Sequence, residues 1–543
     1  MKSFRSCLKS LARRFSPMRG KVWVSVLIGM VDVALSLAFV WVSKLTVDIA
    51  VGASAEPLSK GVALFAGILV MQIVCRISEK YWEGYIQVGF QNKFRADAFS
   101  KVMRSEWNGT DRFHSGDAVN RLEGDIATVS DFLCINFPQC IVTAMQLIAA
   151  TVFLFFLQPQ LGWIVTFIMP VAVVCSRLFF KKMRKLTGEI RAGDSRVQGH
   201  MQENIQHRIL VRTLMGTASV LEKFGNLQLS VRRLTISRLG YGAIARGFMN
   251  LGFSAGYATA FLWGVYGLQD GTVTYGMMVA FLQLVGQVQR PVASLASHIP
   301  AFIRTLASEE RLMELTDSPQ EIEGEPVVFA SAPGIRVENL TYSYPGRDEV
   351  LFGGLCYDFK PGSMTAILGS TGVGKSTLVK VIMALLTPSS GKVLLYGDGK
   401  TVDSGVDTRC NFMYVPQGNS LMSGSIRDNL HLAKPDAGED ELRDALHQAA
   451  ADFVFNLKDG IDTSCAEVGV GLSEGQAQRI AIARALLRPG GILILDEATS
   501  ALDASTELEL LSRLAEHYRG VKTILCITHR PAATTYADGT IEL

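Results

Sequence analysis

The longest uncharged stretch of the chain constrains its fold more than any other feature. No Asp, Glu, Lys or Arg occurs from Phe132 to Ser176. One bilayer span needs about 20 apolar residues, so this stretch is long enough for two. The segment 158–160, Gln-Pro-Gln, divides it at a tight hairpin turn. We therefore predict an α-helical polytopic membrane domain.

Six membrane spans are expected in all. They cover about 22–43, 60–80, 132–157, 160–180, 241–268 and 274–302. The turns at 158–160 and 269–271 carry almost no positive charge, whereas 81–131 and 181–240 are rich in Lys and Arg. The positive-inside rule then places both long segments and both chain ends in the cytoplasm.

The charge distribution separates two classes of partner. The net charge of +3 hides a basic region 1–334 and an acidic region 335–543. A basic region can face nucleic acid or an anionic membrane surface, and the uncharged stretches favour the membrane. We expect no nucleic-acid partner. The 9 cysteines form no C-x-x-C pair, so we interpret them as reduced, buried thiols.

The N-terminal segment 1–21 is basic and has no acidic residue. Phe4, Leu8, Leu11 and Phe15 recur at helical spacing, which puts an apolar stripe opposite a basic face. This pattern is typical of an interfacial helix lying on anionic headgroups. A mitochondrial presequence or a signal-peptide n-region are the alternatives, but no small-residue cleavage site follows.

The two long cytoplasmic segments are expected to be helices that continue beyond the bilayer. Short transverse turns are predicted near Trp107–His114 and Thr213–Phe224. Residues 317–334 are rich in Pro, Gly and acids and are predicted to be a linker. The remaining segment, 335–543, alternates apolar β-runs with helical segments, which predicts a soluble α/β domain after the membrane domain 22–316.

A phosphate-binding loop lies at the start of this α/β domain. Gly369-Ser-Thr-Gly-Val-Gly374-Lys375-Ser376 matches G-x-x-x-x-G-K-[ST] between an apolar run and a helical segment. Small residues let backbone N–H groups curl around phosphate oxygens at a helix N-terminus. The candidate nucleotide-binding residues here are Gly369, Ser370, Thr371, Gly372, Val373, Gly374, Lys375, Ser376 and Thr377. Lys375 would reach the β- and γ-phosphates, and Ser376 a Mg²⁺ ion.

A buried strand ending in two acids follows further along the chain. The run Ile-Leu-Ile-Leu precedes Asp496 and Glu497. Alone it is a common structural pattern, but after a phosphate-binding loop it suggests that Asp496 holds Mg²⁺ through water. Glu497 would then polarise the attacking water.

Leu472-Ser473-Glu474-Gly475-Gln476, followed by Ala-Gln-Arg-Ile-Ala-Ile-Ala-Arg-Ala, resembles the signature of ABC ATPases. With the helix and spans before it, almost the whole chain resembles an exporter-type (type IV) ABC half-transporter with a membrane domain and an ATPase domain in one polypeptide.

Further motifs lie in the order that this family has. Tyr344 resembles the aromatic residue that stacks on adenine, and Gln417 the Q-loop residue that senses Mg²⁺ and contacts the membrane domain. Residues 500–503, Ser-Ala-Leu-Asp, resemble the D-loop, and His529 the switch histidine on the γ-phosphate. Singly, Tyr344, Gln417 and His529 could be a core tyrosine, a surface amide and a hydrogen-bonded histidine.

The resemblance implies how these motifs work together. Two ATPase domains associate head to tail, so Ser473, Gly475 and Gln476 of one chain would complete the ATP site of the other. ATP binding would close the domains and hydrolysis would open them. The two transverse turns resemble coupling helices that transmit closure to the membrane domain and produce alternating access.

Two features depart from the family pattern. The third signature residue is usually Gly but is Glu474 here, and a carboxylate near a partner's γ-phosphate would repel it. We expect a competent but tuned site. The chain also stops about where the family continues into another strand and terminal helices, which puts C-terminal contacts between two ATPase domains in doubt.

Polar residues inside the predicted spans suggest where a substrate could bind. Gln283, Gln287 and Arg290 share one face of the last span and could line a central cavity, and Asp32 lies midway along the first. Alternatively, Asp32 pairs internally and Arg290 lies in a water-accessible stretch near the cytoplasm.

The predicted function is ATP-driven transmembrane export, with MgATP hydrolysis at two composite sites. The catalytic candidates are Glu497, His529 and Gln417, and the metal candidates Ser376, Gln417 and Asp496. A homodimer in a bacterial inner membrane is favoured over a heterodimer. The substrate stays unassigned among drugs, lipids, peptides and other small molecules. The alternatives are an ATP-gated channel or transport regulator, a non-transport ABC ATPase such as a translation or DNA-repair factor, and an importer.

Overall fold

The computed structural model describes residues 4–543 apart from 108–114, 323, 346–348, 371, 466–470 and 531. The chain divides into two compact units. We call Met1–Ser100 with Asp117–Thr316 the helical unit, and Lys101–Gly116 with Asp317–Leu543 the α/β unit.

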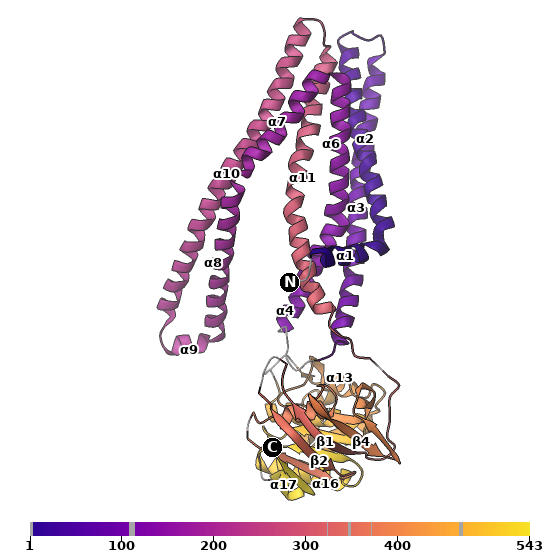
Figure 1. Cartoon of the computed structure of the whole chain (residues 1–543), viewed down its shortest axis with the longest axis vertical. Helices are drawn as coiled ribbons and strands as arrows, with labels where there is room; N and C mark the ends of the chain where they lie inside the picture. The colour runs from indigo at the N-terminus through magenta and orange to yellow at the C-terminus, as the bar shows by residue number, and fades with distance from the viewer. Residues whose placement is uncertain are drawn as a thin grey trace. The chain divides into compact units, whose positions relative to one another are not determined.

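Long helices cover every predicted span (Figure 1). They are α2 (Arg19–Ala50), α3 (Leu58–Met103), α6 (Phe137–Leu157), α7 (Pro159–Arg177), α10 (Thr217–Gln269) and α11 (Tyr275–Thr316). Before α6, the chain is helical through α4 (Ser115–Asn120) and α5 (Ile126–Asp131), with π-helical turns at Arg121–Asp125 and Phe132–Asn136.

Among the described residues, 3 helical stretches are long and apolar enough to cross a membrane: Phe4–Ala50, Leu58–Met103 and Gly116–Leu157. A shorter apolar helix covers Pro159–Ala172. The count of six spans therefore stays a prediction, although each predicted span coincides with a helix.

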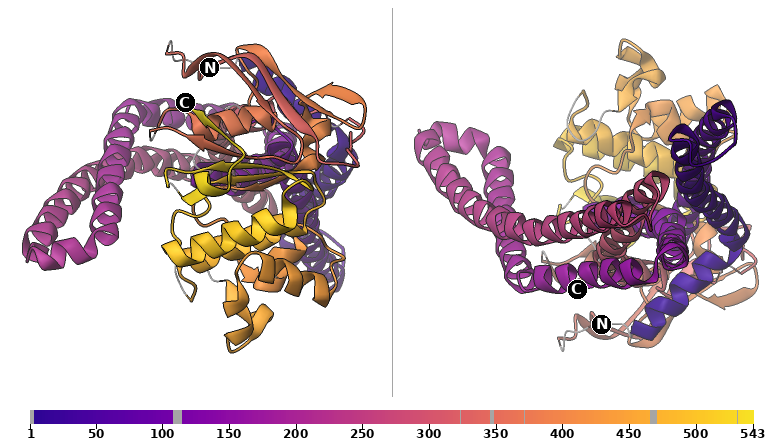
Figure 2. Two further views of the ribbon diagram at one scale, coloured as in Figure 1. Left: turned by 90° about the horizontal axis from the view of Figure 1, so that it is seen from below. Right: turned by 90° about the horizontal axis from the view of Figure 1, so that it is seen from above.

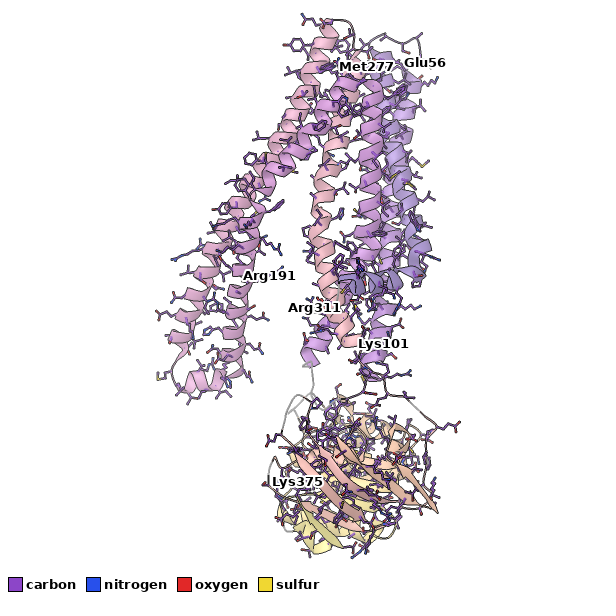
Figure 3. All side chains as sticks on the ribbon, viewed as in Figure 1. Glu56, Lys101, Arg191, Met277, Arg311 and Lys375 are labelled. Atoms are coloured by element: carbon purple, nitrogen blue, oxygen red, sulfur yellow. The ribbon has the colours of Figure 1, made fainter. Side chains whose placement is uncertain are left out.

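Both predicted hairpin turns are present. Only Gln158 separates α6 from α7, with extended backbone (φ −156°, ψ 97°). Pro159 then begins α7, where its missing N–H costs no helical hydrogen bond. Between α10 and α11, Gly271 turns with φ 68°. Figure 3 places Met277, just after this turn, at the same end of the helical unit as Glu56, with Arg311 at the other end.

The second transverse turn lies earlier than predicted. α8 (Phe180–Gln206) pairs with α10, and the short helix α9 (Arg208–Thr213) joins them at their far ends. The prediction of Thr213–Phe224 was wrong, because His207 and Met215 (φ 54°) break the helix and α10 already begins at Thr217. Together α8, α9 and α10 form an arm that diverges from α2, α3 and α6 in each view (Figures 1 and 2). Most of the other turn, 108–114, lies outside the described residues.

The N-terminal helix α1 (Phe4–Phe15) packs on α11. Cys7 and Leu11 are buried, whereas Phe4 is 60% and Leu8 37% exposed. Only part of the predicted apolar stripe is therefore available to a membrane, because one side of the helix contacts the protein itself.

The centre of the α/β unit is a parallel sheet of 5 strands in the order β11-β3-β10-β9-β6. These strands are β3 (Met364–Leu368), β6 (Phe412–Val415), β9 (Ile492–Asp496), β10 (Thr523–Ile527) and β11 (Gly539–Glu542). β3, β9 and β10 are almost wholly buried, as expected for a parallel sheet covered on both faces.

Smaller elements surround this sheet. An antiparallel sheet in the order β2-β1-β4-β5 comprises β1 (Gly334–Tyr342), β2 (Phe352–Phe359), β4 (Ser390–Gly397) and β5 (Lys400–Asp403). β7 (Gly424–Ser425) pairs with β8 (Ser464–Cys465). The helices are α12 (Lys375–Ile382), α13 (Ile426–His431), α14 (Glu439–Gln448), α15 (Glu474–Leu487), α16 (Ala504–Tyr518) and α17 (Ala532–Tyr536).

The structure describes all 9 cysteines, and none of them forms a disulfide bond. Cys7, Cys134, Cys465 and Cys526 are buried, but Cys356 is exposed, so the expectation of buried thiols holds for only part of the set. Cys356 lies on β2, whose residues alternate between the core and solvent.

Candidate functional site

The phosphate-binding loop joins β3 to α12. Gly369, Gly372 and Gly374 have φ values of 145°, 89° and 109°, a region that side chains disfavour. An added Cβ at Gly374 would also lie 2.8 Å from the Leu351 side chain. The loop therefore requires glycine and leaves the N-terminus of α12 open to an anion.

Lys375, labelled in Figure 3, is the first residue of α12 and is 5% exposed. Its Nζ donates hydrogen bonds to the carbonyl oxygens of Gly369 (2.8 Å) and Ser370 (3.0 Å). These bonds hold the ammonium group over the loop, where phosphate oxygens could replace the carbonyls.

Asp496 ends β9 and is 1% exposed. Its carboxylate accepts hydrogen bonds from Ser376 Oγ (2.8 Å) and Tyr414 Oη (3.1 Å). Burial raises the pKa of Asp496 above its ordinary value and the Glu497 carboxylate adds to this effect, while the two hydrogen bonds lower it. The sequence analysis missed Tyr414, because a tyrosine near the end of a strand resembles an ordinary core residue.

Glu497 follows directly and adopts a left-handed backbone conformation with φ 51°. Such a conformation is uncommon for a non-glycine residue and often marks a functional position. Gln417 Nε2 donates a hydrogen bond to Glu497 Oε2 (2.7 Å), and His529 Nε2 lies 3.2 Å from Oε1. The three catalytic candidates therefore form one connected group.

The sheet explains why these residues meet. The phosphate-binding loop, Gln417, Glu497 and His529 follow β3, β6, β9 and β10, which are parallel. Ligands bind at the carboxyl ends of such strands.

A cavity of about 280 Å³ is formed beside the loop. Its lining includes Tyr344, Lys375, Ser376, Gln417 and Glu497. Tyr344 Oη lies 2.8 Å from Thr377 Oγ1, which holds the ring at one wall of the cavity. Glu349 also lines it and was not predicted.

A second cavity, of about 420 Å³, lies beside Asp496 and Gln417. Trp107 lines it together with Lys380, whose Nζ lies 4.9 Å from the centre of the indole ring. The segment after α3 thus contacts the same end of the sheet as the site residues.

The signature residues begin α15. Ser473 caps this helix by accepting a hydrogen bond from the Gln476 N–H (3.2 Å), and Gln476 Oε1 accepts one from the Ser473 N–H (2.9 Å). Glu474 is the first helical residue, a position that favours an acid. At Gly475 an added Cβ would lie 2.8 Å from the Ala501 carbonyl oxygen, so this glycine lets α15 approach the D-loop.

The D-loop is tied to the residue after His529. Arg530 donates hydrogen bonds to the carbonyl oxygens of Leu502 (2.8 Å) and Ser500 (2.7 Å) and to Glu507 (3.0 Å), which is 2% exposed. Hydrogen bonds from Ser505 and Thr506 hold the pKa of Asp503 well below its ordinary range, so this residue caps α16 as a carboxylate.

The predicted nucleotide residues gather into two groups within the α/β unit. One group lines the smaller cavity and consists of Tyr344, Gly372, Gly374, Lys375, Ser376 and Thr377. Ser473, Gly475 and Gln476 do not line it, and neither do the loop residues Gly369, Ser370 and Val373. Thr371 lies outside the described residues.

The oxygen donors fit Mg²⁺. The Ser376 hydroxyl and the buried Asp496 carboxylate already touch, and hard cations prefer oxygen ligands with only one or two carboxylates. Among the described residues no group of three or more His, Cys, Asp or Glu could hold another metal ion.

The helical unit has a cavity of its own, of about 930 Å³. Gln283, Gln287 and Arg290 line it, as the sequence suggested, and Gln72, Gln146 and Asn250 add further amides. The Gln283 and Gln287 side-chain oxygens are buried without a hydrogen-bond partner among the described atoms. Asp32 lies 3.4 Å from Arg76 Nε, which agrees with the internal-pairing alternative.

Comparison with known families gives the same interpretation of both units. A model of the ABC transporter transmembrane region matches residues 22–292, and a model named ABC transporter matches residues 352–500. The chain belongs to the ABC transporter family. It is an exporter-type half-transporter, with a polytopic membrane domain and an ATPase domain that couples ATP hydrolysis to transport.

Relatives of this ABC transporter include exporters with different substrates. The putative multidrug export ATP-binding/permease protein YgaD of Bacillus subtilis is 27% identical over 98% of this chain and 93% of its own length. The ATP-dependent lipid A-core flippase of Chromobacterium violaceum is 27% identical over 87% and 81%.

A solved structure of a bacterial Atm1-family ABC exporter with ATP bound has the same fold. It superposes with a TM-score of 0.80 at 22% identity, over 97% of this ABC transporter and 93% of that chain.

Proposed function

We propose that this ABC transporter works as a homodimer in which two chains form two MgATP sites head to tail. The observation that carries the proposal is the group at the carboxyl end of the parallel sheet, where Glu497 is held by Gln417 and His529 beside Lys375. The alternatives of a channel or a regulator have no observation in their favour.

Lys375 and the backbone N–H groups of the loop bind the phosphates, and Tyr344 offers its ring to the base. Glu497 accepts the proton of the attacking water, with its two oxygens oriented by Gln417 and His529. Ser376 and Asp496, with Gln417, would hold Mg²⁺. Bound there, Mg²⁺ would neutralise charge that develops on the phosphate oxygens.

The signature completes the site of the other chain. Ser473, Gly475 and Gln476 lie at the N-terminus of α15, whose dipole attracts phosphate. They do not line the cavity of their own chain, which favours a role across a dimer interface. The negative charge of Glu474 reduces this attraction. ATP therefore holds the two domains together less tightly than it would if this residue were glycine.

Export would follow from alternating access of the cavity lined by Gln283, Gln287 and Arg290. Closure of the ATPase domains would be passed on through the segment at Trp107 and through α9.

The basic segments 81–131 and 181–240 and the bacterial relatives support an inner-membrane location, with the ATPase domain and both termini in the cytoplasm. The relatives' names cover drugs and a lipid, so the substrate stays open.

A complementation experiment tests the head-to-tail sites. Lys375→Ala disables the phosphate-binding loop, and Ser473→Arg blocks the signature, so each variant alone should lose ATP hydrolysis at both sites. Mixed dimers of the two variants keep one intact site. A co-expressed mixture should recover about a quarter of the wild-type sites. Glu497→Gln added to the Ser473→Arg chain, which supplies the phosphate-binding loop of the one intact site, should abolish the recovered rate.

No recovery, with mixed dimers present by affinity pull-down, would rule out the shared site. ATP hydrolysis by the single Ser473→Arg variant at the wild-type rate would do the same.

A further inference from the structure

Another large cavity, of about 950 Å³, lies entirely within residues 13–97 of the helical unit. It is formed by the end of α1, the start of α2 and the second half of α3. We call it the elbow groove. The ATP site and the proposed substrate cavity share no residue with it.

Basic side chains surround the elbow groove. Arg13, Arg14, Lys21, Lys80 and Lys93 line it, against Asp97 as the one acid of the lining. Two of these cations already have a carboxylate partner. Arg14 Nε lies 2.7 Å from Glu309 Oε1, and Lys80 Nζ lies 2.7 Å from Glu83 Oε2.

Three of the five basic residues remain available. Within the part of the chain that the structure describes, no carboxylate pairs with Arg13, Lys21 or Lys93, and all three are exposed. Cationic side chains left unpaired around one cavity favour an anionic ligand.

The floor and one wall of the groove are apolar. Met18, Ile86 and Phe94 are buried below it, whereas Tyr81 and Tyr85 are 75% and 57% exposed. Lys21 Nζ lies 5.8 Å from the centre of the Tyr85 ring, and the Trp82 indole donates a hydrogen bond to the Lys21 carbonyl oxygen (3.1 Å). The charged rim and the aromatic wall are thus parts of one site.

Two glycines give the groove its width. Gly84 and Gly89 lie on the face of α3 that lines it, and an added Cβ would meet no atom within 4 Å at either position. Larger side chains would therefore fill the groove without a clash in the protein.

The groove lies where a bilayer would meet water. Arg13 and Lys21 precede the first predicted span, whereas Lys80 ends the second and Lys93 follows it, so both sides reach the same edge of the membrane. Basic pockets between membrane helices on the cytoplasmic side bind the headgroups of anionic lipids.

We propose that the elbow groove binds one anionic phospholipid of the cytoplasmic leaflet, with its phosphate between Arg13, Lys21 and Lys93. The acyl chains would lie along Tyr81, Tyr85 and the two glycines. Near a membrane surface each Lys or Arg changes anionic-lipid binding by about fivefold. Removing three charges should weaken binding by at least tenfold.

The test is native mass spectrometry of the full chain in neutral detergent, titrated with phosphatidylglycerol or phosphatidylcholine. The wild type should bind its first phosphatidylglycerol at least tenfold more tightly than phosphatidylcholine. The triple variant Arg13→Gln, Lys21→Gln, Lys93→Gln should lose this preference. A matched triple, Lys181→Gln, Lys182→Gln, Arg184→Gln, removes three charges just after another predicted span and should keep it.

A second pair of variants tests the shape of the groove without a change of charge. Gly84→Leu with Gly89→Leu should prevent tight binding, whereas Gly67→Leu should not, since Gly67 has equally open space on the same helix outside the groove. Basal ATP hydrolysis should be unchanged in all variants, which shows that they fold.

Three results would overturn the proposal. They are equal affinity of the wild type for the two lipids, equal losses in the two charge variants, and tight binding that persists in the Gly84→Leu, Gly89→Leu variant. The second would mean that surface charge alone attracts the lipid. The third would mean that the lipid does not bind in the groove, which would then have another occupant, such as helices of a second copy of the chain.

Discussion

Tyr414→Phe is the sharpest test of the proposed metal site. It removes one hydroxyl, which donates a 3.1 Å hydrogen bond to Asp496, and leaves the ring in place. The Ser376 bond to the other oxygen of Asp496 remains. The variant therefore changes how well the buried carboxylate is stabilised as an anion without changing any atom proposed to touch ATP.

The magnitude follows from the burial of Asp496, which is 1% exposed. A hydrogen bond to a charged group contributes about 1.5–3 kcal/mol, and one pKa unit corresponds to about 1.36 kcal/mol. Losing a donor disfavours the ionised form, so the pKa of Asp496 should rise by about one to two units.

The effect on stability has a defined sign. The folded pKa of Asp496 already lies above its ordinary value of 3.8, so ionised Asp496 destabilises the fold as the pH rises above 3.8. Tyr414→Phe should increase that penalty. Its stability deficit should be larger at neutral pH than well below pH 3.8, where the carboxyl group is protonated in both the folded and the unfolded state.

The assay is kcat/KM for MgATP against pH, with the full chain in nanodiscs, because this ratio reports the ionisation of the free enzyme. The acidic limb should move upward by about one unit or more. Tyr396→Phe is the matched control, since it removes a hydroxyl that donates a 2.8 Å hydrogen bond to Asp358 on the antiparallel sheet. An unmoved acidic limb in Tyr414→Phe, or an equal shift in Tyr396→Phe, would refute the reasoning.

Three further substitutions test other contacts. Glu474→Gly removes a carboxylate that repels the partner's bound γ-phosphate by about 1 kcal/mol. The KM for ATP should therefore fall about fivefold. Unchanged KM and turnover would contradict the hypothesis of a tuned site. Arg530→Ala leaves buried Glu507 without its cation, and denaturant unfolding should show about 3 kcal/mol less stability, with Arg530→Lys restoring part of it. Gly475→Ala places a Cβ 2.8 Å from the Ala501 carbonyl oxygen, so turnover should drop while binding of a fluorescent ATP analogue persists; normal turnover would contradict this contact.

Much of the site can be anticipated from sequence because its residues follow buried strands. A run such as Ile-Leu-Ile-Leu before Asp496 predicts a strand that is buried on both sides. Parallel strands end at the same edge, so residues at or beyond these ends can meet even when they are more than 100 positions apart in the chain. Ser376, in the helix after β3, and Asp496, the last residue of β9, are an example.

Other features depend on long-range packing. Tyr414 is one of several aromatic residues in strands, and only the neighbouring strand β9 shows that its hydroxyl meets Asp496. Likewise, α1 is amphipathic by itself, but its orientation depends on a bond from Arg14 to the buried Glu309 on α11 (2.7 Å). Spacing within α1 carries no information about that partner.

The arm of the helical unit has a mechanical consequence. α10 runs unbroken for 53 residues, which is about 80 Å at 1.5 Å per residue. The predicted span 241–268 lies in the bilayer, so residues 217–240, about 36 Å of helix, project beyond it and pair with α8. A tilt of 10° where the arm leaves the membrane would carry α9 sideways by about 6 Å. The arm therefore acts as a lever, in which a slight rotation among packed helices becomes a displacement of about half a helix diameter.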